Sequence, residues 1–287
     1  MCAVGDATSL LATATSGPSN IVRVGEAQTR QSLLGAVRQA CAAAGITPEN
    51  VERTCVGGSG AARPELAQVV REILAEILTT PISVVGDMEI ALEAAFESGT
   101  GVIVIAGTGS IAYGRDRHGM TLRAGGWGFA IGDEGSAHWI GRAAINSLLR
   151  ASDRSESAAQ SSLAQGLFKT WKVNSLSDLA RAANSIPPPD FAALFPAVVA
   201  SQDELAKEVL ANAGRELAAT AAVVMGRLFA DELGEPVPVA MTGGVFRHAA
   251  IVRDLFYNEL LKLNTRAEIN PRVVDPVEGA LRMARRA

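Results

Sequence analysis

The stretches GVIVIAGTGSIAYG (residues 101–114) and AGGWGFAIGDEGS (residues 124–136) decide how this chain is expected to fold. In the first, the buried-strand pattern of residues 102–106 breaks into Gly107-Thr108-Gly109-Ser110, and a second apolar stretch follows at once. Glycine has no Cβ, so a ligand can approach the bare backbone amides of such a turn. We therefore predict a phosphate cradle of backbone N–H groups and two hydroxyls between two strands. A plain hairpin turn is the alternative, although it lacks the Asn-Gly or Asp-Gly that short hairpins favour.

The second stretch carries Gly125-Gly126-Trp127-Gly128 and Gly132-Asp133-Glu134-Gly135-Ser136 and then opens onto a predicted helix. This order places an acidic pair and free backbone amides at a helix N-terminus. Two glycine-rich loops with a carboxylate between them favour phosphoryl transfer to a polyol. Two alternatives stay open: Trp127 is a core aromatic rather than the wall of a sugar site, and Asp133 and Glu134 are ordinary charges of a helix N-terminus.

Composition narrows the class of protein. The chain has 287 residues, 48% of them hydrophobic and 5% aromatic, which suits an α/β enzyme of one large domain or two domains sharing a cleft. A net charge of −4 without a basic cluster argues against nucleic acid or an anionic membrane as partner. The apolar runs are too short to span a bilayer, and the N-terminus lacks the pattern of a signal peptide. Three cysteines without metal-ligand spacing indicate reduced thiols, so we expect a cytoplasmic protein.

Strands and helices alternate in the first hundred residues. A hairpin is predicted over residues 1–17, helices over 28–44, 64–78 and 88–97, and strands over 53–56 and 82–85, which indicates a largely parallel sheet. The strand pattern restarts after Gly99. A long helical region, interrupted by prolines, covers 136–232. A strand over 237–241 and helices over 246–263 and 276–286 follow, and arginines in the last helix are expected to complement its dipole.

Two further positions are candidates for binding or catalysis. Asp87 follows an apolar strand, where a carboxylate could take the proton of an attacking hydroxyl, but a cap for the next helix is an equal alternative. Gly243-Gly244 follows the strand at 237–241 and would let a flat ring lie against the backbone, unless it is a plain strand-to-helix turn. His118, His138 and His248 lack partners at ligand spacing, so no metal site is assigned.

These residues together carry a family resemblance. Asp87, IAGTGS (105–110), GGWG (125–128), GDEGS (132–136), GPSN (17–20) and MTGGVF (241–246) are similar to motifs of the N-acetylglucosamine kinase group. That group lies within the BadF/BadG/BcrA/BcrD ATPase family of the sugar-kinase, Hsp70 and actin superfamily. The resemblance covers essentially the whole chain.

The resemblance implies two RNase H-like, actin-like ATPase domains around a cleft. The first would comprise residues 1–99, with the helix of 275–287 packing back on it. The second would comprise 100–274 with a helical insertion. Asp87 would be the catalytic base. ATP and its phosphates would be bound by seven residues: Gly107, Thr108, Gly109, Ser110, Gly243, Gly244 and Val245.

The resemblance also implies the remaining partners of the site. An amino sugar would be contacted by Asn20 (otherwise a turn former), Thr108, Gly126, Trp127 and Asp133. Mg²⁺ would be held by nucleotide phosphates and water rather than by a protein cage. The protein would be a homodimer.

The chain departs from the family at one point. Members begin with a strand that carries Asp-Gly-Gly-Gly-Thr and binds phosphate, and no such motif stands here. The first domain is therefore expected to lack its N-terminal, central strand and to expose apolar strand edges. We interpret this as a start codon assigned too late, with natural truncation as the alternative. A smaller departure is Gly86, where relatives often carry Asn.

The leading hypothesis is an ATP-dependent kinase that phosphorylates N-acetylglucosamine or a related amino sugar, such as glucosamine, at the 6-hydroxyl. N-acetylmuramic acid is an open alternative within the same class. From other classes, an ATPase activator of a radical dehydratase would need cysteines after the GTG loop, where Cys41 and Cys55 do not lie. A sugar-binding pseudo-kinase remains a third hypothesis, because the first phosphate loop is missing.

Overall fold

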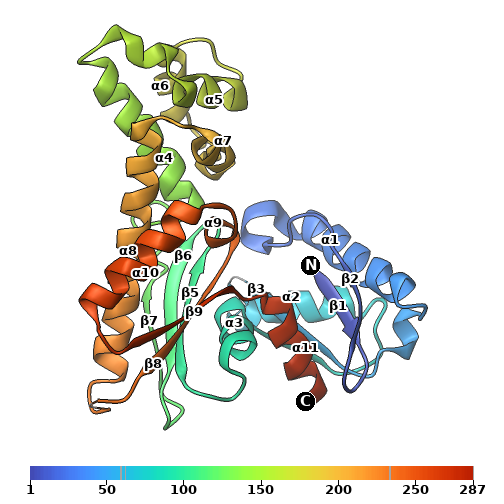
Figure 1. The fold of residues 1–287 in the computed structure, drawn as a ribbon. Helices are drawn as coiled ribbons and strands as arrows, with labels where there is room; N and C mark the ends of the chain where they lie inside the picture. Colours follow the sequence, from blue (N-terminus) through green and yellow to red (C-terminus); the bar gives the residue numbers. More distant parts are fainter. Residues whose placement is uncertain (59, 62, 233, 287) are drawn as a thin grey trace. The chain divides into compact units, whose positions relative to one another are not determined.

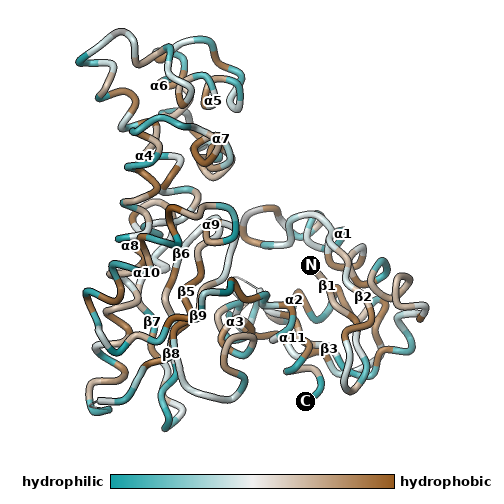
Figure 2. Tube along the Cα trace, in the orientation of Figure 1, coloured by the Kyte–Doolittle hydropathy of each residue, from teal (hydrophilic) through white to brown (hydrophobic). Residues whose placement is uncertain are grey.

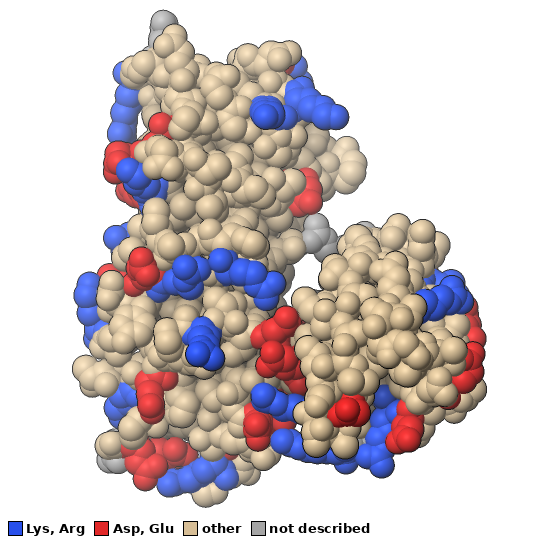
Figure 3. Space-filling model, turned by 45° about the vertical axis from the view of Figure 1, so that its right-hand side comes forward, with Lys and Arg blue, Asp and Glu red and all other residues tan. Residues whose placement is uncertain are grey.

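The computed structural model describes residues 1–58, 60–61, 63–232 and 234–286, and these divide into two compact units (Figure 1). Unit 1 comprises Met1–Gly99 and Val274–Ala287, and unit 2 comprises Thr100–Val273. Within the described residues, no helix is long and apolar enough to cross a membrane. Basic and acidic side chains are interspersed on the face that Figure 3 shows, in keeping with the small net charge of −4.

Unit 1 contains two separate pairs of strands. β1 (Cys2–Gly5) and β2 (Leu10–Ala14) form the predicted antiparallel hairpin, and β3 (Thr54–Gly58) pairs in parallel with β4 (Ile82–Gly86). No strand ladder joins the two pairs in the described part of the chain, so the expected continuous parallel sheet is not formed. Every residue of β1 and β3 is only half-buried. Unit 1 therefore carries apolar strand edges without a neighbour among the described residues.

The helices of unit 1 differ from the predicted ones mainly at their ends. α1 (Ile21–Ala43) begins before the predicted residue 28, because Asn20 caps it by accepting a hydrogen bond from the Val22 amide at 3.1 Å. A backbone φ of 75° at Gly25 kinks its first turns, which hides the helical periodicity there. α2 (Pro64–Leu74) follows, and α3 (Asp87–Phe96) and α11 (Pro276–Arg286) lie within about a residue of their predicted limits.

α11 is held against α3 by its arginines. Arg282 donates to the carbonyl oxygens of Glu93 and Ala94, each at 3.2 Å, and Arg286 pairs with the buried Glu93 carboxylate at 2.7 Å. Arg285 donates to backbone oxygens in the turn between β1 and β2. Arg285 and Arg286 lie in the last turn of α11, as the expected complement to its dipole requires, and the three arginines also bind carbonyls and a carboxylate of other elements.

Unit 2 is built on a five-stranded sheet in the order β7-β6-β5-β8-β9. Antiparallel pairing joins β7, β6 and β5, and parallel pairing joins β5, β8 and β9. Figure 2 shows the hydrophobic character of its central strands. The bounds are β5 Gly101–Ala106, β6 Ser110–Arg115, β7 Thr121–Gly125, β8 Val237–Thr242 and β9 Ala267–Val273. The sequence did not predict β7 or β9.

The long helix α8 (Glu204–Leu228) covers one face of this sheet, and α10 (Ala250–Leu263) packs on α8 (Figure 1). The close approach of α8 to the sheet requires a glycine in β6, because a Cβ on Gly114 would lie 2.8 Å from Val224 of α8. α4 (Ala137–Ser152) and α8 extend away from the sheet and carry three smaller helices: α5 Ser162–Trp171, α6 Leu176–Ala183 and α7 Phe195–Ala200. The short α9 (Gly244–His248) follows β8 and lies against β5, β8 and α10.

Replacing Gly279 with alanine tests the packing of α11 on α3. A Cβ there would lie 1.9 Å from the Ile90 carbonyl oxygen and 2.6 Å from the Ala94 amide nitrogen, so the helices must separate. We expect Gly279→Ala to lower the free energy of unfolding by about 1–3 kcal/mol in urea titrations followed by circular dichroism. The control is Gly226→Ala in α8, where a Cβ meets no atom within 4 Å and should stabilise the helix by about 0.5–1 kcal/mol. Equal effects of the two changes would contradict the proposed packing.

Candidate functional site

Two glycine loops lie side by side at one edge of the unit 2 sheet. β5 and β8 are parallel neighbours, with Ile105 opposite Thr242, so their carboxyl ends meet at the same edge. The first strand runs into residues 107–110 and the second into 243–245. A Cβ on Gly243, whose φ is 105°, would lie 2.2 Å from the Ala106 carbonyl oxygen. Only glycine allows this approach of the two loops.

The loop of residues 107–110 leaves part of its backbone available to a ligand. The Gly107 amide donates to the Gly109 carbonyl at 2.9 Å, whereas the amides of Thr108 and Gly109 have no partner among the described residues. The Thr108 side chain is exposed, and a Cβ on Gly107 would meet nothing within 4 Å. Two amide donors, a hydroxyl and open space fit an anionic ligand such as a phosphate.

The Ser110 hydroxyl is turned toward the neighbouring loop. Ser110 is buried, and its Oγ donates to the Glu134 carbonyl oxygen at 2.7 Å. That the Thr108 hydroxyl faces a ligand stays a prediction, while the Ser110 proton joins the loops of residues 107–110 and 132–136.

The first amides of α4 bind the glycine loop rather than remaining free. The Ala137 and His138 amides donate to the Gly107 and Thr108 carbonyls at 2.9 and 3.3 Å, and the Trp139 amide donates to the Ser136 Oγ at 3.1 Å. The sequence expectation of free amides at this helix N-terminus was therefore wrong. These bonds instead fix the orientation of the loop of residues 107–110.

Asp133 lies between the loop of residues 107–110 and the loop of residues 125–128. Its Oδ1 accepts a hydrogen bond from the Gly128 amide at 3.2 Å, and its Oδ2 would lie 2.6 Å from a Cβ on Gly109. Burial raises the pKa of Asp133; the Gly128 amide opposes this shift, nearby Glu134 adds to it, and the Ser110 amide opposes it. Its φ of 59° is left-handed, a strained conformation that the surrounding contacts must maintain.

Trp127 is an exposed aromatic ring, which settles one alternative left open by the sequence. Its exposed fraction is 69%, so it is not part of the core. Gly126, with φ 67°, precedes it at a point where a Cβ would meet Ile111 at 2.6 Å. The Arg123 guanidinium lies over the Trp127 ring, 4.6 Å from its centroid. The ring is thus held on one side and can offer its surface to a ligand.

Asp87 and Asn20 belong to unit 1. Asp87 is the first residue of α3 but not its cap: Gly86 holds that position, and Glu89 Oε1 accepts the Gly86 amide hydrogen at 3.1 Å. The Asp87 Oδ1 accepts a hydrogen bond from the Met88 amide at 3.1 Å. Burial raises the pKa of Asp87 despite the opposing amides of Met88 and Asp87 itself. A half-buried carboxylate at the end of a strand is thereby made more basic.

Within the described residues, no group of three His, Cys, Asp or Glu side chains could hold a metal ion. His138 instead stacks near Phe129 and Phe191, with ring centroids 4.9 and 5.1 Å away. A complex of Mg²⁺ with nucleotide phosphates could bring the ion without such a group. The unpartnered amides of Thr108 and Gly109 fit the phosphates of such a complex.

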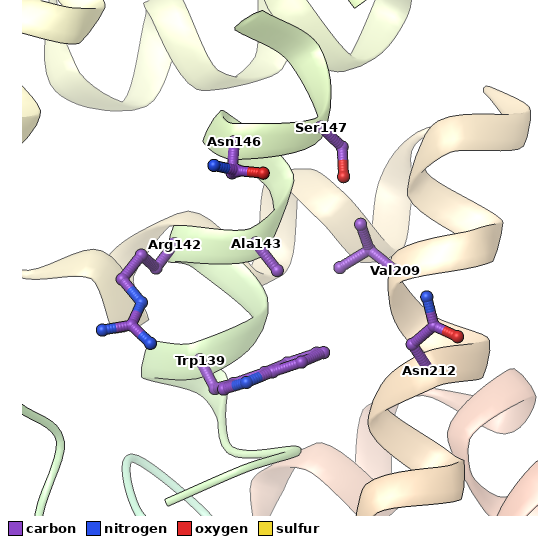
Figure 4. A pocket seen from close by; sticks show the side chains of 7 residues that line it. All are labelled: Trp139, Arg142, Ala143, Asn146, Ser147, Val209 and Asn212. Carbon is purple, nitrogen blue, oxygen red and sulfur yellow. The ribbon is translucent and has the colours of Figure 1, made fainter. Parts of the chain in front are cut away.

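A hollow of about 440 Å³ lies elsewhere in unit 2, between α4 and α8 (Figure 4). Its lining contains no carboxylate and no glycine loop, so it offers no group to accept the proton of a hydroxyl. The seven lining residues are Trp139, Arg142, Ala143, Asn146, Ser147, Val209 and Asn212. The loops at the sheet edge, and not this hollow, form the candidate site.

Comparison with known proteins places this geometry in a family. The model of the BadF/BadG/BcrA/BcrD ATPase family matches residues 1–284. An N-acetylmuramic acid/N-acetylglucosamine kinase of Clostridium acetobutylicum is 31% identical over 255 residues, 86% of this chain and 81% of that protein. An N-acetyl-D-glucosamine kinase of Dictyostelium discoideum is 30% identical over 239 residues, 80% of this chain and 74% of that protein.

Solved structures show the same fold. A proposed N-acetylglucosamine kinase from Chromobacterium violaceum superimposes with a TM-score of 0.70 at 25% identity, covering 95% of this chain and 90% of that one. A ROK family glucokinase from Streptomyces griseus superimposes with a TM-score of 0.61 at 15% identity, covering 99% and 95%. The predicted fold class, an α/β protein of the sugar-kinase and actin-like type, is confirmed.

Gly243→Ala and Gly244→Ala should have different effects on stability, because neighbouring backbone would meet a Cβ at Gly243 and not at Gly244. Gly243→Ala places a Cβ 2.2 Å from Ala106 and strains a φ of 105°, so we expect the free energy of unfolding to fall by about 1–3 kcal/mol. Gly244→Ala meets no atom within 4 Å and should change it by less than about 0.5 kcal/mol. Chemical denaturation of both variants checks this, and a destabilised Gly244→Ala would contradict the open position of that residue.

Proposed function

Because the chain belongs to the BadF/BadG/BcrA/BcrD ATPase family, we propose that it is an ATP-dependent kinase of amino sugars. The reaction would transfer the γ-phosphoryl group of ATP to a hydroxyl of N-acetylglucosamine or a related amino sugar, leaving ADP. The observation that carries the proposal is the pair of glycine loops at the ends of β5 and β8, with Asp133 packed against the first. Two relatives at about 30% identity that are named for this activity support it.

In this proposal the nucleotide binds along the edge of the unit 2 sheet. The Thr108 and Gly109 amides donate to phosphate oxygens, and Gly107 gives the phosphates room. The adenosine lies against Gly243, Gly244 and Val245, where Gly244 is exposed and faces open space. Mg²⁺ enters with the phosphates and neutralises part of their charge. Fixed backbone donors stabilise charge that develops on the transferring group.

The amino sugar would be bound by an aromatic ring and by polar groups. Trp127 offers an aromatic surface for the sugar ring, and Asp133 offers a carboxylate whose oxygens accept hydrogen bonds from hydroxyls. Thr108 and the Gly126 backbone add polar contacts, and Asn20 contributes from the start of α1.

Asp87 would be the general base that accepts the proton of the attacking hydroxyl, which we assign to the 6-position. The Met88 amide donates a hydrogen bond to its Oδ1, and burial raises the pKa of Asp87, so the carboxylate is a better proton acceptor than an exposed aspartate. We also propose that the enzyme acts as a cytoplasmic homodimer, and neither nucleic acid nor membrane enters the reaction.

The dehydratase-activator alternative gains no support from the cysteines. Cys2, Cys41 and Cys55 all belong to unit 1, whereas the GTGS loop belongs to unit 2. Burial raises the pKa of Cys2 and of Cys55 to about 11, which disfavours the thiolates that an iron–sulfur cluster requires.

A coupled assay of ADP release tests the proposed function. We expect turnover with N-acetylglucosamine or N-acetylmuramate that exceeds turnover with glucose at equal concentration, together with a sugar phosphate detected by mass spectrometry. ADP release that does not depend on any amino sugar would contradict the kinase proposal. Binding of sugar without turnover would support the pseudo-kinase alternative instead.

Asp87→Asn tests the base assignment. Loss of the proton acceptor should lower kcat by about 100- to 10,000-fold while sugar and ATP still bind. In the unmodified enzyme, kcat/KM should fall as the pH drops through the pKa of Asp87, at a pH above its ordinary value of 3.8, because protonation removes the base. Asp153→Asn, at the exposed carboxyl end of α4, is the matched control and should retain full activity. A kcat of Asp87→Asn within a few-fold of the unmodified enzyme would exclude this role.

A further inference from the structure

Arg123 on β7 is fastened to the loop that carries Trp127. Its Nη1 donates to the Gly125 carbonyl oxygen at 2.9 Å and to the Gly126 carbonyl oxygen at 3.3 Å. Its guanidinium lies 4.6 Å from the centroid of the Trp127 ring. Three contacts thus fix a positive charge beside an exposed aromatic ring. A long side chain held in this way loses little further entropy when it binds a ligand.

The Arg123 charge is not neutralised within the described residues. No Asp or Glu oxygen lies within ion-pair distance of it in the parts of the chain that the structure describes, and its Nε and Nη2 donors have no hydrogen-bond acceptor there. Arg30 and Arg282, by contrast, both face carboxylates. The planar fork of an arginine matches a carboxylate, which can accept two parallel hydrogen bonds.

A neutral sugar gives such a cation no partner of opposite charge. The same loop already holds Asp133, whose carboxylate suits the hydroxyls of a sugar and would repel an acidic substituent. A fixed cation at Trp127 is the feature that would allow an acidic substituent to bind there in spite of Asp133. The pairing of Trp127 with Arg123 therefore suits a pyranose ring that bears a carboxylate.

We propose that Arg123 is a specificity-determining residue that binds the carboxylate of an acidic amino sugar, the chemical class of N-acetylmuramic acid. In that sugar a lactyl ether on the ring carries the carboxylate. The inference rests on the proposed function, because it takes Trp127 to be part of the sugar site. It adds to that function a preference for acidic over neutral amino sugars.

Steady-state kinetics with N-acetylmuramate and N-acetylglucosamine test the assignment. Arg123→Gln should lower kcat/KM for N-acetylmuramate roughly 10- to 100-fold, mainly through KM, because a charge-assisted pair is lost. For N-acetylglucosamine the change should stay within about 3-fold. Arg123→Lys keeps the positive charge but loses the planar guanidinium. Its kcat/KM for N-acetylmuramate should therefore lie between that of the unmodified enzyme and that of Arg123→Gln. Arg142→Gln, which removes an exposed arginine of α4 elsewhere in unit 2, should leave the ratio of the two sugars unchanged.

Two kinetic outcomes would overturn the assignment. Equal losses for both sugars in Arg123→Gln would mean that Arg123 only supports the Trp127 loop. If Arg123→Gln keeps full activity and an unchanged ratio of kcat/KM for the two sugars, Arg123 contacts neither sugar. Circular dichroism of each variant checks folding, and if Arg123→Gln is unfolded, the comparison of Arg123→Lys with the unmodified protein decides.

A binding titration separates failure of this inference from failure of the proposed function. N-acetylmuramate and N-acetylglucosamine are each titrated calorimetrically into the unmodified protein and the same variants, without turnover. Selective weakening of N-acetylmuramate in Arg123→Gln supports the assignment even if no sugar is phosphorylated. Equal affinities for the two sugars in the unmodified protein, or binding of neither, overturn it, even if the chain proves to be a kinase.

Discussion

The parallel pairing of β5 with β8 is the constraint on which the candidate site depends. It brings together two loops that are more than a hundred residues apart in the sequence, because parallel strands end at the same edge of a sheet. The backbone of Gly243 then lies so close to Ala106 that any Cβ would collide with its carbonyl oxygen. The loop after β8 is therefore seated directly on the end of β5, and the amides of Thr108 and Gly109 remain available beside it.

A second constraint comes from α4, whose first backbone amides donate hydrogen bonds to the loop of residues 107–110. A helix N-terminus commonly binds an anion through such amides. Here Ala137 and His138 donate to the carbonyls of Gly107 and Thr108, so the peptide groups of the loop are oriented with their carbonyls toward the helix. The helix positions the loop, and the loop itself supplies the donors for a ligand. The Ser110 hydroxyl donates to the Glu134 carbonyl oxygen and so joins the loop of residues 107–110 to the loop of residues 132–136.

In the unit 2 sheet, the sequence predicted the central strands β5, β6 and β8 and missed the edge strands β7 and β9. β5 and β8 are continuous apolar runs because both faces are covered, whereas the edge strands β7 and β9 bury few side chains and give no such pattern. The sequence predicted that the motifs of the candidate site form loops, but it did not predict the contacts that join these loops to one another. The bond from Ser110 to Glu134 and the contacts of Arg123 with the Trp127 loop follow from tertiary packing, which periodicity does not report. The turn of residues 116–120 before β7 was the one local feature that could have revealed that strand.

Asp87 of unit 1 and Asp133 of unit 2 have different surroundings, although burial raises the pKa of each. Asp133 is held on several sides: Oδ1 accepts from the Gly128 amide, Oδ2 lies against Gly109, and the backbone is fixed in a left-handed conformation. A carboxylate restrained in this way suits recognition of a hydroxyl rather than proton transfer. Among the residues that the structure describes, Asp87 accepts hydrogen bonds from amides of the first turn of α3, its own and that of Met88. Since Glu89 already caps that helix, Asp87 is not needed as a cap, which is compatible with the role of general base that we propose for it.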